Sequence, residues 1–134
     1  MDEHADRVSL TAPPELIDEL DALVDDLNYA SRSEAIRDAL RSYITDCRWR
    51  ADAATAKQGS IVVLYDHESG VNNEILSLHH EMPDVITSVQ HVHLSQHRCL
   101  ETLIVESSGE RISTLADRLR SLEGVQQVRL AIVG

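Results

Sequence analysis

Residues 7–12 alternate between polar and apolar side chains, and this segment constrains the fold more than any other part of the 134-residue chain. A period of two predicts a β-strand with one polar and one apolar face. The polar face carries Arg7, Ser9 and Thr11. Two amphipathic helices are predicted next, over 13–27 and 32–48, so the strand has no neighbour to pair with in this part of the chain.

A unit of one strand and two helices in about 45 residues is too small to bury a stable core by itself. A single strand also leaves its backbone N–H and C=O groups without partners. Both difficulties disappear if two chains intertwine and pair these strands antiparallel. We therefore predict that the first part of the chain is an obligate dimer.

The start of the second predicted helix carries a pattern that suits phosphate. Ser31 and Glu34 fit a capping box, and free N–H groups at a helix N-terminus bind phosphate. Ser31, Arg32 and Ser33 are therefore candidates to hold a DNA backbone. A two-stranded ribbon fits the major groove, where arginine and hydroxyl groups contact base edges. The polar strand face alone is better explained by solvation, but the strand, both helices and the capping box together favour DNA binding.

A second pattern begins after Gly59. β-type runs cover 61–65, 85–94, 98–106 and 125–133, and helical patterns cover 72–81 and 112–122. The order βαββαβ is the ferredoxin-like arrangement used by ACT-type regulatory domains. We predict an α+β protein with a DNA-binding domain over 1–48, a linker over 49–58 and an ACT-like domain over 59–134.

The second half also carries a predicted metal site. His91 and His93 lie two residues apart on a predicted strand, so their imidazoles share one face. If 95–97 is a hairpin turn, Cys99 returns nearly opposite His93. Three ligands then converge on one ion.

A fourth ligand has two candidates, His79 and His80, at the end of the helix predicted over 72–81. His97 lies on the turn and is expected to be exposed to solvent. Imidazole nitrogens with one thiolate suit Ni(II), Cu(II) or Zn(II). The pattern alone does not choose between square-planar and tetrahedral geometry.

The composition limits the remaining possibilities. The net charge of −11 argues against nucleic acid, but a single lysine and no phenylalanine among many acids indicate a salt-loving organism, in which acidity serves solvation. No apolar run approaches the roughly 20 residues of a membrane span, and the first residues lack a signal-peptide pattern; we expect a cytoplasmic protein with no membrane association. Two cysteines do not indicate a disulfide framework. No catalytic triad, phosphate loop or catalytic carboxylate pair is present, so we expect no enzyme.

Together these residues resemble the nickel-responsive transcriptional regulator (NikR) family across nearly the whole chain. The resemblance is carried by Arg7-Val8-Ser9-Leu10-Thr11, by the stretch from Arg32 to Arg41, by Tyr65-Asp66-His67-Glu68 and by His91-Val92-His93 with Cys99. The first segment looks like the ribbon of a ribbon-helix-helix domain. One departure is the loop Ser69-Gly70-Val71, which lacks the basic residues that some relatives direct at DNA.

The resemblance implies a square-planar Ni(II) site, with one ion per subunit. His91, His93 and Cys99 would come from one subunit and His80 from a neighbour, which leaves His79 as the non-ligand. It also implies a homotetramer, built as a dimer of dimers. Glu34 and Asp38, one helical turn apart, match positions tied in the family to a cation site between the domains; a solvated helix face is the simpler interpretation.

The predicted function is a repressor whose binding to double-stranded operator DNA is promoted by nickel, with nickel uptake as the expected target. One alternative is a ribbon-helix-helix regulator whose ACT domain senses an amino acid or another transition metal. Another is a metal buffer or chaperone that does not bind DNA. A regulator that senses an amino acid predicts no need for Cys99, and a metal buffer or chaperone predicts no need for Arg7, Ser9 and Thr11.

The charge distribution yields a prediction about salt. Residues 1–50 hold 12 acidic residues against 6 arginines, and half of the acids lie on the outer face of the helix over 13–27. Few cationic contacts to DNA imply weak non-specific binding and a shallow dependence of operator affinity on salt. Binding titrations at increasing salt concentration measure this slope. A steep loss of affinity, as for a strongly basic repressor, would contradict the prediction.

Overall fold

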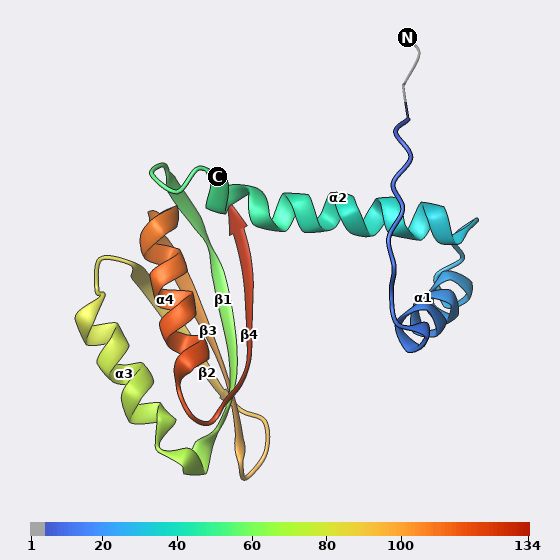
Figure 1. The fold of residues 1–134 in the computed structure, drawn as a ribbon. Coiled ribbons are helices and arrows are strands. Elements are labelled where there is room, and N and C mark those ends of the chain that lie inside the picture. Colours follow the sequence, from blue (N-terminus) through green and yellow to red (C-terminus); the bar gives the residue numbers. More distant parts are fainter. Residues whose placement is uncertain (1–4) are drawn as a thin grey trace. The chain divides into compact units, whose positions relative to one another are not determined.

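The computed structural model describes residues 5–134, so that His4 lies outside the described residues (Figure 1). The chain divides into two compact units, Met1–Tyr43 and Ile44–Gly134. Helix α2, Arg32–Ala51, contributes residues to both units. Within the described part of the chain, no helix combines the length and the apolar character that crossing a membrane requires.

Two helices form most of the first unit. Helix α1 spans Pro14–Asp26, within one residue of its predicted ends, and α2 begins at Arg32 as predicted. Ser31 Oγ accepts a hydrogen bond from the Glu34 N–H group at 3.2 Å, which is the first half of the capping box. The Glu34 carboxylate accepts from the Ala30 N–H group at 2.8 Å, one residue earlier than the capping box requires.

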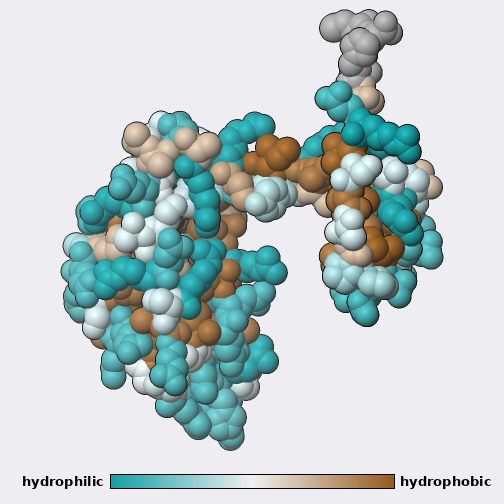
Figure 2. Space-filling view, in the orientation of Figure 1, coloured by the Kyte–Doolittle hydropathy of each residue, from teal (hydrophilic) through white to brown (hydrophobic). Residues whose placement is uncertain are grey.

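The strand predicted over 7–12 is not formed in the single chain. A strand requires hydrogen bonds to a neighbouring strand, and no described strand pairs with this segment. Val8 and Leu10 are instead 79% and 67% exposed. Leu10 lines an apolar groove of about 320 Å³ with leucines of α1 and with Ile36 of α2. The first unit thus exposes the side chains that a paired ribbon would bury, and hydrophobic residues are visible on its surface in Figure 2.

The second unit is a four-stranded antiparallel sheet covered on one face by two helices (Figure 1). Its elements are β1 Ala56–Asp66, a short 3-10 helix His67–Ser69, α3 Val71–Glu81, β2 Ile86–His93, β3 Arg98–Ser108, α4 Gly109–Ser121 and β4 Val125–Val133. The strand order is β2-β3-β1-β4. The predicted βαββαβ order and the α+β fold are confirmed.

Every second residue of the two central strands faces the helices. On β1 these are Ile61, Val63 and Tyr65, and on β3 they run from Cys99 to Val105; each is buried. They pack in one core with apolar residues of α3 and α4. This alternation explains why Tyr65 and Cys99, both near the hairpin end of the sheet, point inward.

Residues 49–58, expected to be a linker, hold the last turn of α2, a turn, and the first residues of β1. Trp49 is buried in the core of the second unit, which explains why the helix continues through it to Ala51. Strand β1 starts at Ala56 although its first residues are polar, because it pairs with both β3 and β4. At Gly59 the strands approach so closely that an added Cβ would lie 2.2 Å from the Ala131 carbonyl oxygen.

Candidate metal centre

Cys99 is the centre of the candidate site. It lies directly opposite Tyr65 on β1 and opposite His93 on β2, so the three side chains form one row on the helix-covered face. The row confirms the predicted pairing of His93 with Cys99. Cys99 is fully buried, and its Sγ atom is 3.4 Å from His93 Nδ1.

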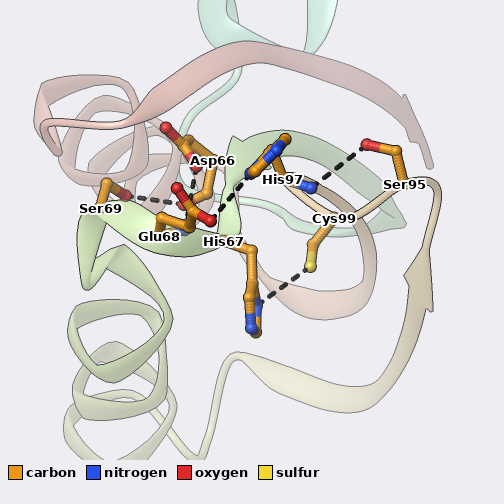
Figure 3. Close-up of polar contacts among 7 residues, drawn as sticks. All are labelled: Asp66, His67, Glu68, Ser69, Ser95, His97 and Cys99. Atoms are coloured by element: carbon orange, nitrogen blue, oxygen red, sulfur yellow. Dashed lines mark hydrogen bonds and ion pairs between the residues drawn. The ribbon is translucent and has the colours of Figure 1, made fainter.

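His67 completes a group of three donors. Its Nδ1 atom is 3.5 Å from Cys99 Sγ (Figure 3), and the ligand atoms of His67, His93 and Cys99 all lie within 4.8 Å of one another. The His67 N–H group donates to the His97 carbonyl at 2.8 Å, which ties the 3-10 helix to the β2–β3 turn. In sequence, His67 lies 32 residues from Cys99, so spacing along the chain does not indicate it as a donor. The signal for its position was the topology, since β1 and β3 are neighbours in a βαββαβ sheet.

His91 lies on the next row, opposite Glu101. Its ring centroid is 4.8 Å from that of His93, and its Nδ1 atom is 3.2 Å from the Tyr65 hydroxyl. The two histidines therefore share a face, as predicted. His91 is exposed, and its ring packs edge-on against that of His93, but it is not one of the three donors grouped around Cys99.

The two histidines at the end of α3 have different surroundings. His80 is exposed. Among residues 5–134, it does not belong to a close group of three potential metal ligands such as the one around Cys99. His79 turns inward, with its Nε2 atom 4.0 Å from a Glu101 carboxylate oxygen. His79 Nε2 and the other Glu101 oxygen are buried without a hydrogen-bond partner among the described residues.

Burial changes the proton affinity of three groups around the site. It raises the pKa of the Glu101 carboxyl and lowers the pKa of His79, where the nearby His80 adds to the effect. Burial, followed by the charges of Glu101 and Cys99, raises the pKa of Tyr65 far above its ordinary value. Tyr65 therefore keeps its proton at neutral pH.

The donors at this end of the sheet fit a borderline divalent ion. A buried sulfur and imidazole nitrogens suit Ni(II), Cu(II) or Zn(II) better than a hard cation. His97, as expected, is exposed, and its Nδ1 atom pairs with Glu68 at 2.9 Å (Figure 3). This contact joins the β2–β3 turn to the 3-10 helix at the rim of the site.

The predicted DNA-contacting residues all lie on the surface of the first unit. Arg7, Ser9 and Thr11 are exposed, as are Ser31, Arg32 and Ser33. The Arg32 guanidinium donates to both carboxylate oxygens of Asp21, at 2.9 and 2.7 Å. This interaction holds the pKa of Asp21 below its ordinary value. The two residues are 11 positions apart and lie on different helices, so the sequence pattern does not indicate this pair.

The carboxylates of Glu34 and Asp38 both accept hydrogen bonds inside the first unit. Glu34 accepts from the Ala30 N–H group, and Asp38 accepts from the Tyr29 hydroxyl. That bond to Asp38 raises the pKa of Tyr29. Each carboxylate keeps further acceptor capacity.

Comparison with known proteins places this arrangement in a family. Residues 58–133 match the NikR C-terminal nickel-binding domain, and residues 6–46 match ribbon-helix-helix proteins of the copG family. The chain belongs to the nickel-responsive regulator (NikR) family. The resemblance noted from the sequence is thereby confirmed, and with it the ribbon-helix-helix and ACT-like domains.

Curated relatives of the NikR family match nearly end to end. A protein named "Putative nickel-responsive regulator" from Methanocaldococcus jannaschii is 42% identical over 96% of this chain and 92% of its own length. A protein of the same name from Thermococcus kodakarensis is 41% identical over 96% of this chain and 93% of that protein's length.

Among solved structures, the ACT domain of a GTP pyrophosphokinase from Chlorobium tepidum matches with a TM-score of 0.51 and 19% identity. It covers 57% of this chain and 100% of that domain. This likeness concerns the fold of the second unit alone.

The buried Glu101 carboxyl makes stability depend on pH. Its pKa is higher in the folded than in the unfolded chain, so its ionisation destabilises the fold once the pH exceeds the ordinary value of 4.5. We expect Glu101→Gln to raise the free energy of unfolding of the metal-free protein at pH 7, with the gain disappearing as the pH falls below about 4.5. Denaturant unfolding across pH, at one fixed protein concentration, measures the difference.

Glu106→Gln is the matched control, because Glu106 is an exposed carboxylate on the same strand. It should leave the pH dependence unchanged. If Glu101→Gln instead lowers stability at pH 7, a charged pair between Glu101 and His79 stabilises the fold and our assignment of their charge states is wrong.

Proposed function

We propose that this chain is a repressor of transcription whose binding to double-stranded operator DNA is promoted by Ni(II), and that it controls nickel uptake. The observation that carries the proposal is the row of Tyr65, Cys99 and His93, which places a buried sulfur beside imidazole donors at one end of the sheet. Membership of the NikR family and the ribbon-helix-helix match support the rest.

The proposed ligands are His91, His93 and Cys99 of one subunit and His80 of the partner subunit, with one ion per subunit. The exposure of His80 and the inward turn of His79 toward Glu101 support His80 as the donor available to a neighbour. Nickel, when bound, would link ligands from two subunits. A homotetramer, built as a dimer of dimers, provides the necessary neighbours.

His67 is the rival fourth donor, since it lies beside Cys99 in the same subunit. The two ligand sets differ in a simple way. We expect His80→Ala to weaken nickel affinity by at least about 100-fold, because it removes a ligand, and His67→Ala to weaken it by no more than about 10-fold, as for a residue around the ligands. Nickel titration against a competing chelator measures both affinities. The reverse ranking would assign the fourth position to His67.

DNA is proposed to contact the polar face of the paired ribbon through Arg7, Ser9 and Thr11. Pairing two chains would cover the apolar groove that Leu10 lines. Ser31, Arg32 and Ser33 lie at the start of α2, where free N–H groups suit phosphate. The Arg32 guanidinium is already paired with the Asp21 carboxylate. We therefore expect Arg32 to fix the start of α2 against α1 more than to add positive charge for DNA.

Nickel and DNA affinity must then be linked, each raising the other by the same factor. Fluorescence anisotropy with operator DNA, with nickel and with excess chelator, tests the linkage. We expect binding that is at least about 10-fold tighter with nickel, corresponding to a coupling free energy of about 1.4 kcal/mol. Cys99→Ser should abolish the difference, and Arg7→Ala should weaken binding while leaving nickel affinity unchanged. Equal affinity with nickel and with chelator would exclude the switch.

Glu34 and Asp38 are proposed as a second, weaker cation site. Their spacing of one helical turn and their remaining acceptor capacity support it, although both carboxylates already accept hydrogen bonds. An ACT domain that senses an amino acid or another metal is the alternative to nickel. The row around Cys99 favours a metal, and its donor types favour nickel, copper or zinc.

A further inference from the structure

Tyr65 connects helix α3 to the candidate metal site. Its ring is fully buried on β1, and its hydroxyl oxygen lies 3.1 Å from Asn72 Oδ1 and 3.2 Å from His91 Nδ1. Asn72 is in the first turn of α3, and His91 is on β2. One hydroxyl group thus contacts one residue of the helix and one proposed ligand.

The donors and acceptors in this series of three contacting groups, Asn72, Tyr65 and His91, determine where their protons lie. The Asn72 side-chain oxygen accepts only, so the Tyr65 hydroxyl donates its single proton to it. The phenol oxygen can then only accept from His91, which therefore carries its proton on Nδ1. In the neutral imidazole, the other ring nitrogen, Nε2, then carries the lone pair.

His93 presents its Nδ1 atom to a different partner. Its Nδ1 atom faces Cys99 Sγ at 3.4 Å, so Nδ1 is the nitrogen closest to the proposed sulfur ligand. The two histidines of the His-x-His pair therefore use Nδ1 for different partners, the Tyr65 hydroxyl and the Cys99 sulfur. For His91 the position of the proton is set by Tyr65 and, through it, by Asn72.

We propose that Asn72 is a positioning residue for nickel, holding His91 through Tyr65 in the form whose Nε2 atom is free to bind the ion. This inference rests on the proposed nickel site. It also connects α3 to two sites: Asn72 in its first turn acts on His91 of the same subunit, and its last turn carries His80, which is offered to the site of the partner subunit. Groups that orient a metal-binding imidazole typically change metal affinity by about 10- to 100-fold.

The test uses the full-length protein and four variants. Asn72→Ala removes the acceptor, and Asn72→Asp keeps an acceptor oxygen. Asn73→Ala and Asn73→Asp are matched controls, because Asn73 is an exposed residue of the same turn and Asn73→Asp adds the same charge as Asn72→Asp. Asn72 is itself exposed, so we expect every variant to fold.

Two measurements are made on each protein. Nitrogen-15 NMR of the metal-free protein reports which ring nitrogen of His91 carries the proton, and nickel titration against a chelator reports affinity. We expect Nδ1–H in the wild type, a shift toward Nε2–H in Asn72→Ala, and at least about 10-fold weaker nickel binding in that variant. Asn72→Asp should keep the His91 proton on Nδ1 and the nickel affinity of the wild type, and both Asn73 variants should match the wild type in both measurements.

Wild-type His91 protonated on Nε2, or Asn72→Ala with affinity within about 2-fold of wild type, would overturn the proposal. A double-mutant cycle with Tyr65→Phe adds a third criterion. The double variant should bind nickel as weakly as Tyr65→Phe alone, and additive losses would show that Asn72 does not act through Tyr65. If the wild type binds no nickel, the proposed function fails, while the metal-free NMR result still decides the role of Asn72.

Discussion

The antiparallel pairing of β3 with both of its neighbours is the interaction on which the site depends. Because β3 lies between β1 and β2, Cys99 has Tyr65 on one side and His93 on the other. A shift of either pairing by one residue would turn Cys99 and its neighbours to opposite faces of the sheet. The buried alternation on β1 and β3 holds this register, since the same shift would expose the core. The packing that stabilises the second unit therefore also positions its sulfur and nitrogen donors.

The first unit obeys a different constraint, because it exposes the apolar residues that a core would need. Val8 and Leu10 are largely exposed, and an apolar groove lies open beside Leu10. In the proposed dimer, pairing with a second chain would cover these residues and would place two polar strand faces side by side. The high negative charge then matters less than the position of a few cationic and hydroxyl groups. In this account, affinity for DNA comes from shape and from specific contacts more than from a broad positive field.

Much of the second unit could be predicted, because alternation and helical spacing are local properties of the sequence. The order of its elements and the pairing of His93 with Cys99 followed from them. The early start of β1 could not, because its first residues are polar and are held by neighbouring strands. His67, and the contacts of His79 with Glu101 and of Arg32 with Asp21, depend on residues far apart in sequence. The strand over 7–12 is not formed in the single chain, because no described strand pairs with it.

The central claim is that nickel joins ligands from two subunits, and mixed tetramers test it most directly. His80→Ala subunits retain His91, His93 and Cys99, whereas Cys99→Ser subunits retain His80. The account predicts that neither protein alone binds nickel tightly, and that unfolding and refolding them together creates tight sites wherever the two kinds of subunit meet. Nickel titration of the mixture against a chelator would detect these sites. If the mixture binds no more tightly than its components, or if His80→Ala alone binds as the wild type does, the ligands come from one subunit and the account is wrong.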